Sequence, residues 1–117
     1  MEAAIHEYSI VQALLDRVAE EARSHGARIV HRLRVQIGEQ SGVESELLAA
    51  AFELARERTL CERADLEIVP VPARWQCDLC RREIEPGQVL RCPVCEAPAR
   101  MVSGDEIVLE RIEMEAA

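Results

Sequence analysis

The sequence contains no lysine: all fourteen cationic residues are arginine, against twenty-two aspartates and glutamates. The resulting formal charge of −8 opposes binding to a phosphate backbone unless a local basic patch overrides it. Aromatic residues are also scarce, with one Trp, one Tyr and one Phe, whereas proteins that grip nucleic acid usually stack bases on aromatic platforms. We therefore expect no nucleic-acid partner.

Long apolar runs and common catalytic motifs are also missing. No stretch approaches eighteen consecutive apolar residues, and the opening residues lack a basic segment followed by an apolar one. We therefore expect a soluble, cytoplasmic protein with no membrane partner. The sequence has no Gly-rich phosphate loop and no HExxH helix. Its scattered carboxylates cannot be assembled into an acid/base pair from spacing alone.

The most specific feature that is present is a pair of CxxC motifs, Cys77-Asp78-Leu79-Cys80 and Cys92-Pro93-Val94-Cys95, separated by eleven residues. Each two-residue gap lets a tight turn aim both sulfurs at one point, so four thiolates can complete a tetrahedral Zn²⁺ shell. Such a shell has no open coordination position, which indicates a structural site. The alternatives are two disulfides or four unrelated thiols. A fifth cysteine, Cys61, lies outside the pattern, and an odd count fits a reducing compartment better than a disulfide framework.

The cysteine segment does not have the charge of a nucleic-acid-binding zinc ribbon. Five arginines and four acids lie between residues 74 and 100, which gives a net charge of +1 before the metal is counted. Four thiolates contribute −4 and zinc +2, so the segment becomes −1 and the whole chain changes from −8 to −10. Trp75 is expected to pack against this small metal-held loop.

Hydrophobic periodicity predicts two helices. Residues 7–23 have a four-residue apolar stripe, and Gly26 ends this helix, with His25 favourable at its carboxyl end; metal binding is the alternative role for His25. Ser41-Gly42-Val43-Glu44 matches a capping box, so a second helix is expected to run to about Arg58.

Period-two alternation predicts three strands, at residues 27–38, 64–71 and 106–113. In the first, His31 falls by parity on the apolar face, where a hydrogen-bonded histidine is more common than a metal ligand. The last has an imperfect pattern that requires a bulge or two-sided burial. Pro86-Gly87 predicts a turn between two short strands, and residues 98–104 a return connection. The predicted fold is α+β: two helices packed on a small three-stranded sheet, with an inserted zinc-ribbon-like lobe held by the four cysteines.

Three further segments, together with the CxxC pair, resemble the HypA/HybF family of hydrogenase maturation proteins. They are His6-Glu7-Tyr8-Ser9-Ile10 at the head of a helix, Arg34-Val35-Gln36-Ile37-Gly38-Glu39, and Ala51-Phe52-Glu53-Leu54-Ala55. The resemblance covers nearly the whole chain. It implies a nickel metallochaperone, not an enzyme, that serves [NiFe] hydrogenase and in some organisms urease. It also implies a HypB-like GTPase maturation partner and the hydrogenase large subunit as partners, with the protein itself a monomer or weak homodimer.

Residue by residue, the resemblance matches His6 and Glu7 to the nickel-binding pair and the four cysteines to the ligands of a structural zinc ion. It divides the chain into a nickel-binding α+β domain, residues 1–72 completed by the strand in 104–117, and a zinc-binding lobe, residues 73–103. In the family the His-Glu pair normally follows the initiator Met, whereas here residues 2–5 intervene. Either His6 binds with preceding amides, or the extension folds aside, or the true start lies downstream.

Two other functions are compatible with the residues alone. A zinc-ribbon adaptor or transcription-associated module would bind protein or nucleic acid through the cysteine segment. A zinc hydrolase or deaminase is the weakest interpretation, because an all-cysteine shell leaves no open position and the H-x-E deaminase signature is absent.

Overall fold

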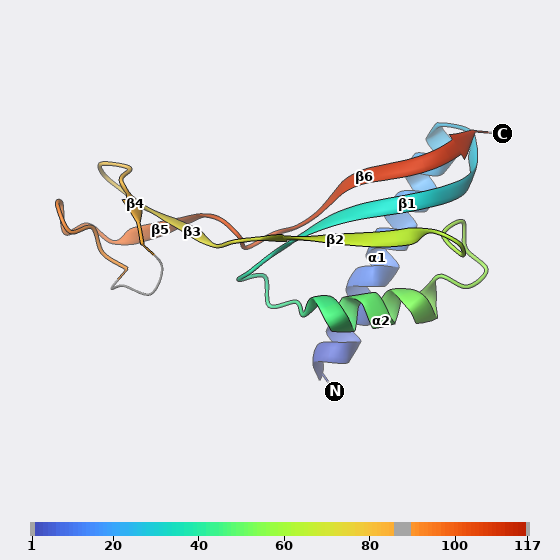
Figure 1. Ribbon diagram of the computed structural model, residues 1–117, viewed down its shortest axis with the longest axis horizontal. Helices are drawn as coiled ribbons and strands as arrows, with labels where there is room; N and C mark the ends of the chain where they lie inside the picture. The colour runs from blue at the N-terminus through green and yellow to red at the C-terminus, as the bar shows by residue number, and fades with distance from the viewer. Residues whose placement is uncertain (1, 86–89, 117) are drawn as a thin grey trace.

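The structure is a computed structural model that describes residues 2–85 and 90–116. Its elements, in chain order, are α1 (Glu2–Ser24), β1 (Ala27–Gly38), α2 (Ser45–Ala55), β2 (Asp65–Val71), β3 (Arg74–Cys77), β4 (Glu83–Ile84), β5 (Ala99–Ser103) and β6 (Ile107–Ala116). They form an elongated molecule of 57 × 33 × 17 Å (Figure 1). None of the helices in the described part of the chain is long and apolar enough to cross a membrane.

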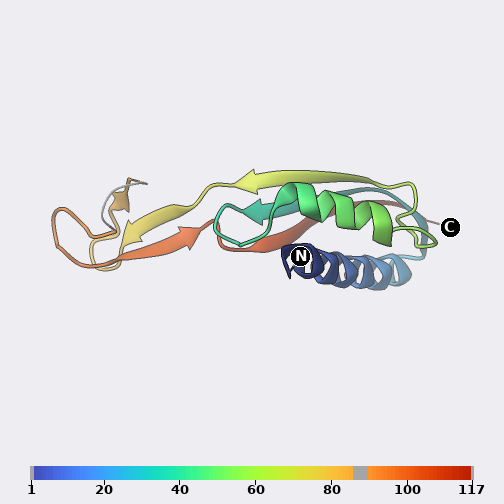
Figure 2. The same ribbon diagram turned by 90° about the horizontal axis from the view of Figure 1, so that it is seen from below.

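The main sheet has the strand order β2-β1-β6, with β1 parallel to β2 and antiparallel to β6. Helices α1 and α2 lie together on one face of it, and α2 provides the crossover between the two parallel strands (Figure 2). The predicted α+β fold with two helices on a three-stranded sheet is therefore confirmed, and the final strand joins the sheet beside β1.

The core lies between this sheet and the helices. It is built from the apolar stripes of α1 and α2 and the inward face of β1, and its buried members include Val11, Leu15, Val18, Val30, Leu33, Val35, Leu48 and Phe52. The opposite face of the sheet is polar: Arg34 pairs with Glu67 at 2.9 Å and lies 3.7 Å from Glu110. One face of the sheet therefore packs against the helices, and the other carries ion pairs between side chains on neighbouring strands.

Two bulges alter the predicted strand patterns. Val30 pairs with Met114 and Arg32 with Glu113, so His31 is an extra residue in β1. The bulge reverses the alternation, which makes the prediction of His31 on the apolar face wrong; the side chain is exposed and bonds Glu115 at 3.1 Å. For the last strand, where either a bulge or two-sided burial was predicted, the structure has a bulge, because Glu110 is left unpaired in β6.

The helix boundaries differ from the prediction. α1 begins at Glu2, so His6 and Glu7 lie inside the helix. The prediction of a capping box at residues 41–44 is wrong. Glu44 is the N-cap residue of α2 and makes no side-chain hydrogen bond to the helix. Ser41 Oγ instead accepts a hydrogen bond from the N–H of Val43 within the preceding loop. α2 ends at Ala55 because the chain turns through residues 56–63 toward β2.

The cysteine lobe, residues 73–103, extends from the main sheet on a second antiparallel sheet, with the order β4-β3-β5 (Figure 1). Residues 99–103, predicted as part of a return connection, form β5 instead because they pair with β3. The predicted turn at Pro86-Gly87 lies outside the described residues.

Backbone packing holds the cysteine lobe to the main sheet at one crossing point. A Cβ at Gly38 would lie 2.2 Å from the carbonyl oxygen of Gly104, so only glycine fits this approach. Gln40 N–H donates to the Gly104 carbonyl at 2.7 Å, and Ala73 N–H donates to the Glu39 carboxylate at 2.8 Å. The loop after β1 thus binds both connections to the lobe.

Candidate metal centres

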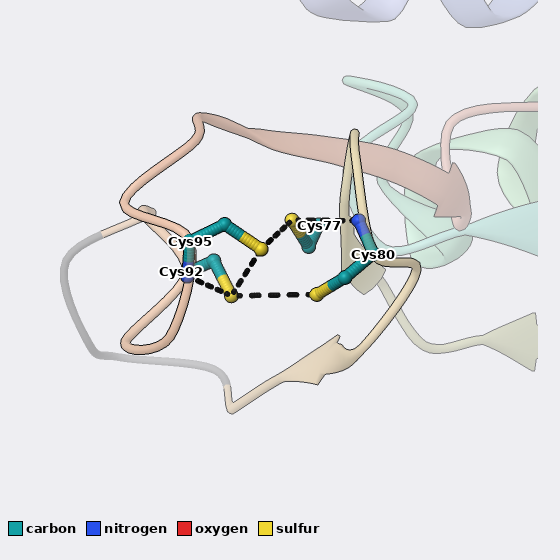
Figure 3. Close-up of side chains that lie close together, drawn as sticks. All are labelled: Cys77, Cys80, Cys92 and Cys95. Atoms are coloured by element: carbon teal, nitrogen blue, oxygen red, sulfur yellow. Dashed lines mark hydrogen bonds between the residues drawn. The ribbon is translucent and has the colours of Figure 1, made fainter.

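The four cysteines of the CxxC pair lie on two turns of the same design. Cys77 N–H donates to the Arg82 carbonyl at 2.8 Å, and Cys92 N–H donates to the Ala97 carbonyl at 2.9 Å. Each turn closes through a non-glycine residue with positive φ, 62° at Arg81 and 60° at Glu96. The repeated geometry presents two cysteines from each turn to the same point (Figure 3).

The sulfur positions match a tetrahedral metal shell. The Sγ atoms of Cys77 and Cys95 are 3.6 Å apart, those of Cys80 and Cys92 3.7 Å, and those of Cys92 and Cys95 3.8 Å; all four lie within 4.8 Å of one another. Zn–S bonds of about 2.3 Å in a regular tetrahedron give a sulfur–sulfur edge of about 3.8 Å. All four cysteines are free of disulfides. The four sulfurs converge as predicted, and the distances between them fit a Zn²⁺ ion.

Backbone donors favour thiolates at two of the four positions. The N–H groups of Cys80 and Leu79 donate to the Cys77 sulfur at 3.4 Å and lower the pKa of that thiol to about 6. The N–H groups of Cys95 and Val94 likewise lower the pKa of Cys92. The thiols of Cys80 and Cys77 raise the pKa of Cys95 to about 12. A thiolate is the form that binds metal, so the amide donors favour the metal-binding form at Cys77 and Cys92, whereas a metal ion must displace the proton of Cys95.

The second candidate centre is the His6-Glu7 pair on α1. The Glu7 side chain is 0 % exposed, because it lies four residues before Val11 in the stripe that faces the core. Its two carboxylate oxygens have no hydrogen-bond partner among the described residues. His6 is 58 % exposed, and its Nδ1 lies 3.5 Å from Glu7 Oε1, a separation that brings the two groups together without a hydrogen bond. An exposed imidazole thus stands beside an unsatisfied carboxylate.

Several residues considered from the sequence lie outside both centres. His25 Nδ1 lies 2.8 Å from the carbonyl of Glu21, so its role at the end of the helix is confirmed. Cys61 is buried in the main core, where burial raises its pKa to about 11, and it stays apart from the four-sulfur cluster. Trp75 packs against the buried cluster of the cysteine lobe, as predicted. Among the described residues, the four cysteines are the one group of three or more potential metal ligands.

Two features of these centres were missed from the sequence. The Leu79 and Val94 amides bond the sulfurs, and their position two residues after the first cysteine of each turn is a usable signal. The burial of Glu7 also had a signal, since it extends the spacing of Val11, Leu15 and Val18 toward the N-terminus. Instead, the role of Glu7 is predicted from the family resemblance alone, and not from its position as a charged residue in an apolar stripe.

Comparison with known proteins gives a consistent result. The family model described as "Hydrogenase/urease nickel incorporation, metallochaperone, hypA" matches residues 5–114. The hydrogenase maturation factor HypA of Wolinella succinogenes is 40% identical over 115 residues, covering 96% of this chain and 97% of the relative. HypA of Nitrosospira multiformis is 40% identical over 112 residues, covering 94% and 97%.

Two solved structures agree in fold as well as sequence. The solution structure of the Ni metallochaperone HypA from Helicobacter pylori has a TM-score of 0.73 and 32% identity, covering 95% of this chain and 98% of its own. A second solution structure, of a HypA protein, has a TM-score of 0.79 and 32% identity, covering 97% and 98%. This protein belongs to the HypA family of hydrogenase/urease nickel-incorporation metallochaperones.

Proposed function

We propose that this protein binds Ni(II) at His6 and Glu7 and delivers it for maturation of a [NiFe] hydrogenase or a urease. The observation that carries the proposal is Glu7, a fully buried carboxylate without a hydrogen-bond partner among the described residues, beside an exposed imidazole. A buried polar group left unsatisfied is costly, and such groups in native proteins call for an explanation such as an ion. Imidazole nitrogen and carboxylate oxygen suit Ni(II).

The comparisons support the same cargo. The Helicobacter pylori relative is described as a Ni metallochaperone, and this chain covers nearly all of it at 32% identity. Family membership therefore favours a nickel carrier over a zinc-ribbon adaptor.

Zinc is the proposed resident metal of the cysteine lobe, bound by Cys77, Cys80, Cys92 and Cys95. Four sulfurs with Sγ–Sγ distances of 3.6–3.8 Å suit tetrahedral Zn²⁺, while the nitrogen and oxygen donors on α1 suit nickel. The two sets of ligands should therefore bind different metals. Four protein ligands leave no position for a substrate, so the zinc ion has a structural role and we assign no catalytic reaction. Residues 73–103 form the zinc-binding lobe in this proposal, and residues 1–72 with 104–117 the nickel-binding domain.

The partners and compartment follow from this role. A carrier must pass its ion to another protein, and we propose a HypB-like GTPase and the hydrogenase large subunit as those partners. Five unpaired cysteines suit the reducing cytoplasm. The strongly acidic chain, near −10 with zinc bound, argues against nucleic acid as a partner.

Complementation of a bacterium that lacks its own HypA tests this function. The wild-type chain should restore nickel-dependent hydrogenase activity, while His6→Ala and Glu7→Gln should not at low nickel. Cys61→Ser is the matched control, because Cys61 lies outside both centres, and it should restore activity fully. Full activity from His6→Ala at limiting nickel would contradict the proposal.

A further inference from the structure

One edge of the main sheet is open to a further strand. β6 is its outermost strand and is ten residues long, and among the described residues no strand pairs with its outer side (Figure 1). Residues 107–116 contain no proline or glycine, whereas β2, at the opposite edge, contains Pro70, which has no backbone N–H to donate. β6 therefore presents an unblocked row of outward backbone donors and acceptors.

The apolar side chains of β6 are only partly covered on the helix side of the sheet. Four of them pack against the core and yet stay half-buried: Ile107, Leu109, Ile112 and Met114. A groove of about 620 Å³ runs beside them, and its opposite wall on α1 is formed by Arg17, Glu21 and His25. A further strand beside β6 would place its own side chains over this exposed apolar area.

The bulge at Glu110 gives β6 a pattern that is complementary to itself. The core-facing residues are odd-numbered before the bulge, at 107 and 109, and even-numbered after it, at 112 and 114. Residues directly opposite each other in an antiparallel pair point to the same face of the sheet. Two antiparallel copies of β6 therefore oppose all four core-facing residues to one another in one register, with the two-fold axis between residues 110 and 111.

The charges favour the same register. Each of its cross-strand pairs occurs twice by symmetry, and they are Ile107 with Met114, Val108 with Glu113, Leu109 with Ile112, and Glu110 with Arg111. The pair at the centre joins opposite charges on the polar face of the sheet, where Glu110 lies 3.7 Å from Arg34. A shift of one residue in either direction would oppose Arg111 to itself or Glu110 to itself, and would set apolar side chains against solvent-facing ones.

We propose that β6 is the docking strand for a second copy of this chain, which adds its own β6 in antiparallel orientation. The two three-stranded sheets would then form one sheet of six strands. The two-fold axis is perpendicular to the sheet, so the helices of both copies lie on one face, and the two cysteine lobes extend from opposite ends. None of the metal-binding residues takes part, so dimer formation and nickel delivery can be tested separately.

The test is sedimentation of the full, zinc-saturated chain over a range of concentrations. The wild type should change from monomer at about 1 μM to dimer at about 500 μM, as a small interface allows. Glu110→Arg and Arg111→Glu should each weaken the dimer at least tenfold, because each opposes like charges twice at the axis. An equimolar mixture of the two variants should dimerise like the wild type, because every arginine at the axis again faces a glutamate.

Matched controls change the charge elsewhere on the surface. Glu57→Arg and Arg63→Glu alter the net charge by the same amounts at exposed positions outside β6, and both should dimerise like the wild type. Melting temperature and zinc content check that each variant is folded. Dimers that persist in both β6 variants, or a mixture of folded variants that stays monomeric, would overturn the proposed pairing.

Hydrogen exchange of the wild type gives a readout that needs no variant. Backbone amides of residues 107–116 should exchange more slowly at about 500 μM than at about 1 μM, because pairing protects the outward N–H groups. A wild-type chain that is still monomeric at about 500 μM would overturn the proposal. So would a dimer in which exchange of these amides is unchanged.

Discussion

Replacing Glu7 by leucine should stabilise the nickel-free protein while abolishing its nickel site. Both carboxylate oxygens are buried without a hydrogen-bond partner among the described residues, and the side chain lies in the apolar stripe of α1. An unsatisfied buried polar group costs about 1–3 kcal/mol, and leucine removes that cost at similar volume. We expect a gain of about 2–3 kcal/mol, which for a chain of this length raises Tm by about 8–12 °C.

The assay is thermal unfolding of the zinc-saturated protein, with and without nickel. Nickel at 100 times its Kd should stabilise the wild type by about 2.7 kcal/mol and leave Glu7→Leu unchanged, so added nickel should largely close the gap between them. Glu20→Leu is the control, because Glu20 is an exposed residue of the same helix and its replacement should change stability by about 0.5 kcal/mol or less. A lower Tm for Glu7→Leu without nickel would mean that the carboxylate has a stabilising partner, and it would contradict the cost assigned here to its burial.

Three further predictions concern zinc, the lobe connection and the fifth cysteine. Cys92→Ala should lose zinc and unfold the cysteine lobe, while Cys61→Ser keeps one zinc per chain; full zinc content in Cys92→Ala by metal analysis would contradict the assignment. Gly38→Ala should lower the free energy of unfolding, measured in urea, by about 3 kcal/mol, because the added Cβ would lie 2.2 Å from backbone. Gly42→Ala is the control: its Cβ would meet no atom within 4 Å, and at φ 81° the substitution should cost about 1 kcal/mol. Burial raises the pKa of Cys61 from about 9 to about 11, so iodoacetamide should leave this thiol unmodified at pH 8. The stability linked to this thiol should fall between pH 9 and 11. Rapid alkylation of the native protein, detected by mass spectrometry, would contradict the burial of Cys61.

Features fixed by local chemistry were predictable from the sequence. The CxxC turns converge because each two-residue gap closes its own turn, which the paired bonds of Cys77 and Cys92 reproduce. The helical and strand periodicities also identified most of the core, since burial follows the apolar stripe of each element.

Features set by contacts between distant segments were not predictable in the same way. The parity of His31 depends on a bulge that exists only because β1 pairs with β6, more than 80 residues away. The capping-box pattern at Ser41 failed because the loop after β1 is held by the connections to the lobe, including the bond from Gln40 to Gly104. The spacing of Glu7 points to the core, but whether a partner meets its carboxylate there depends on how α1 packs.

Titration calorimetry and metal analysis of nickel binding by the zinc-saturated chain, compared between wild type and His6→Ala, test whether His6 holds the nickel ion. We expect one nickel ion per wild-type chain. In His6→Ala, the nickel site should be lost while one zinc ion remains on the four cysteines. Nickel bound to His6→Ala at the wild-type stoichiometry and affinity would contradict the assignment of the site to the head of α1.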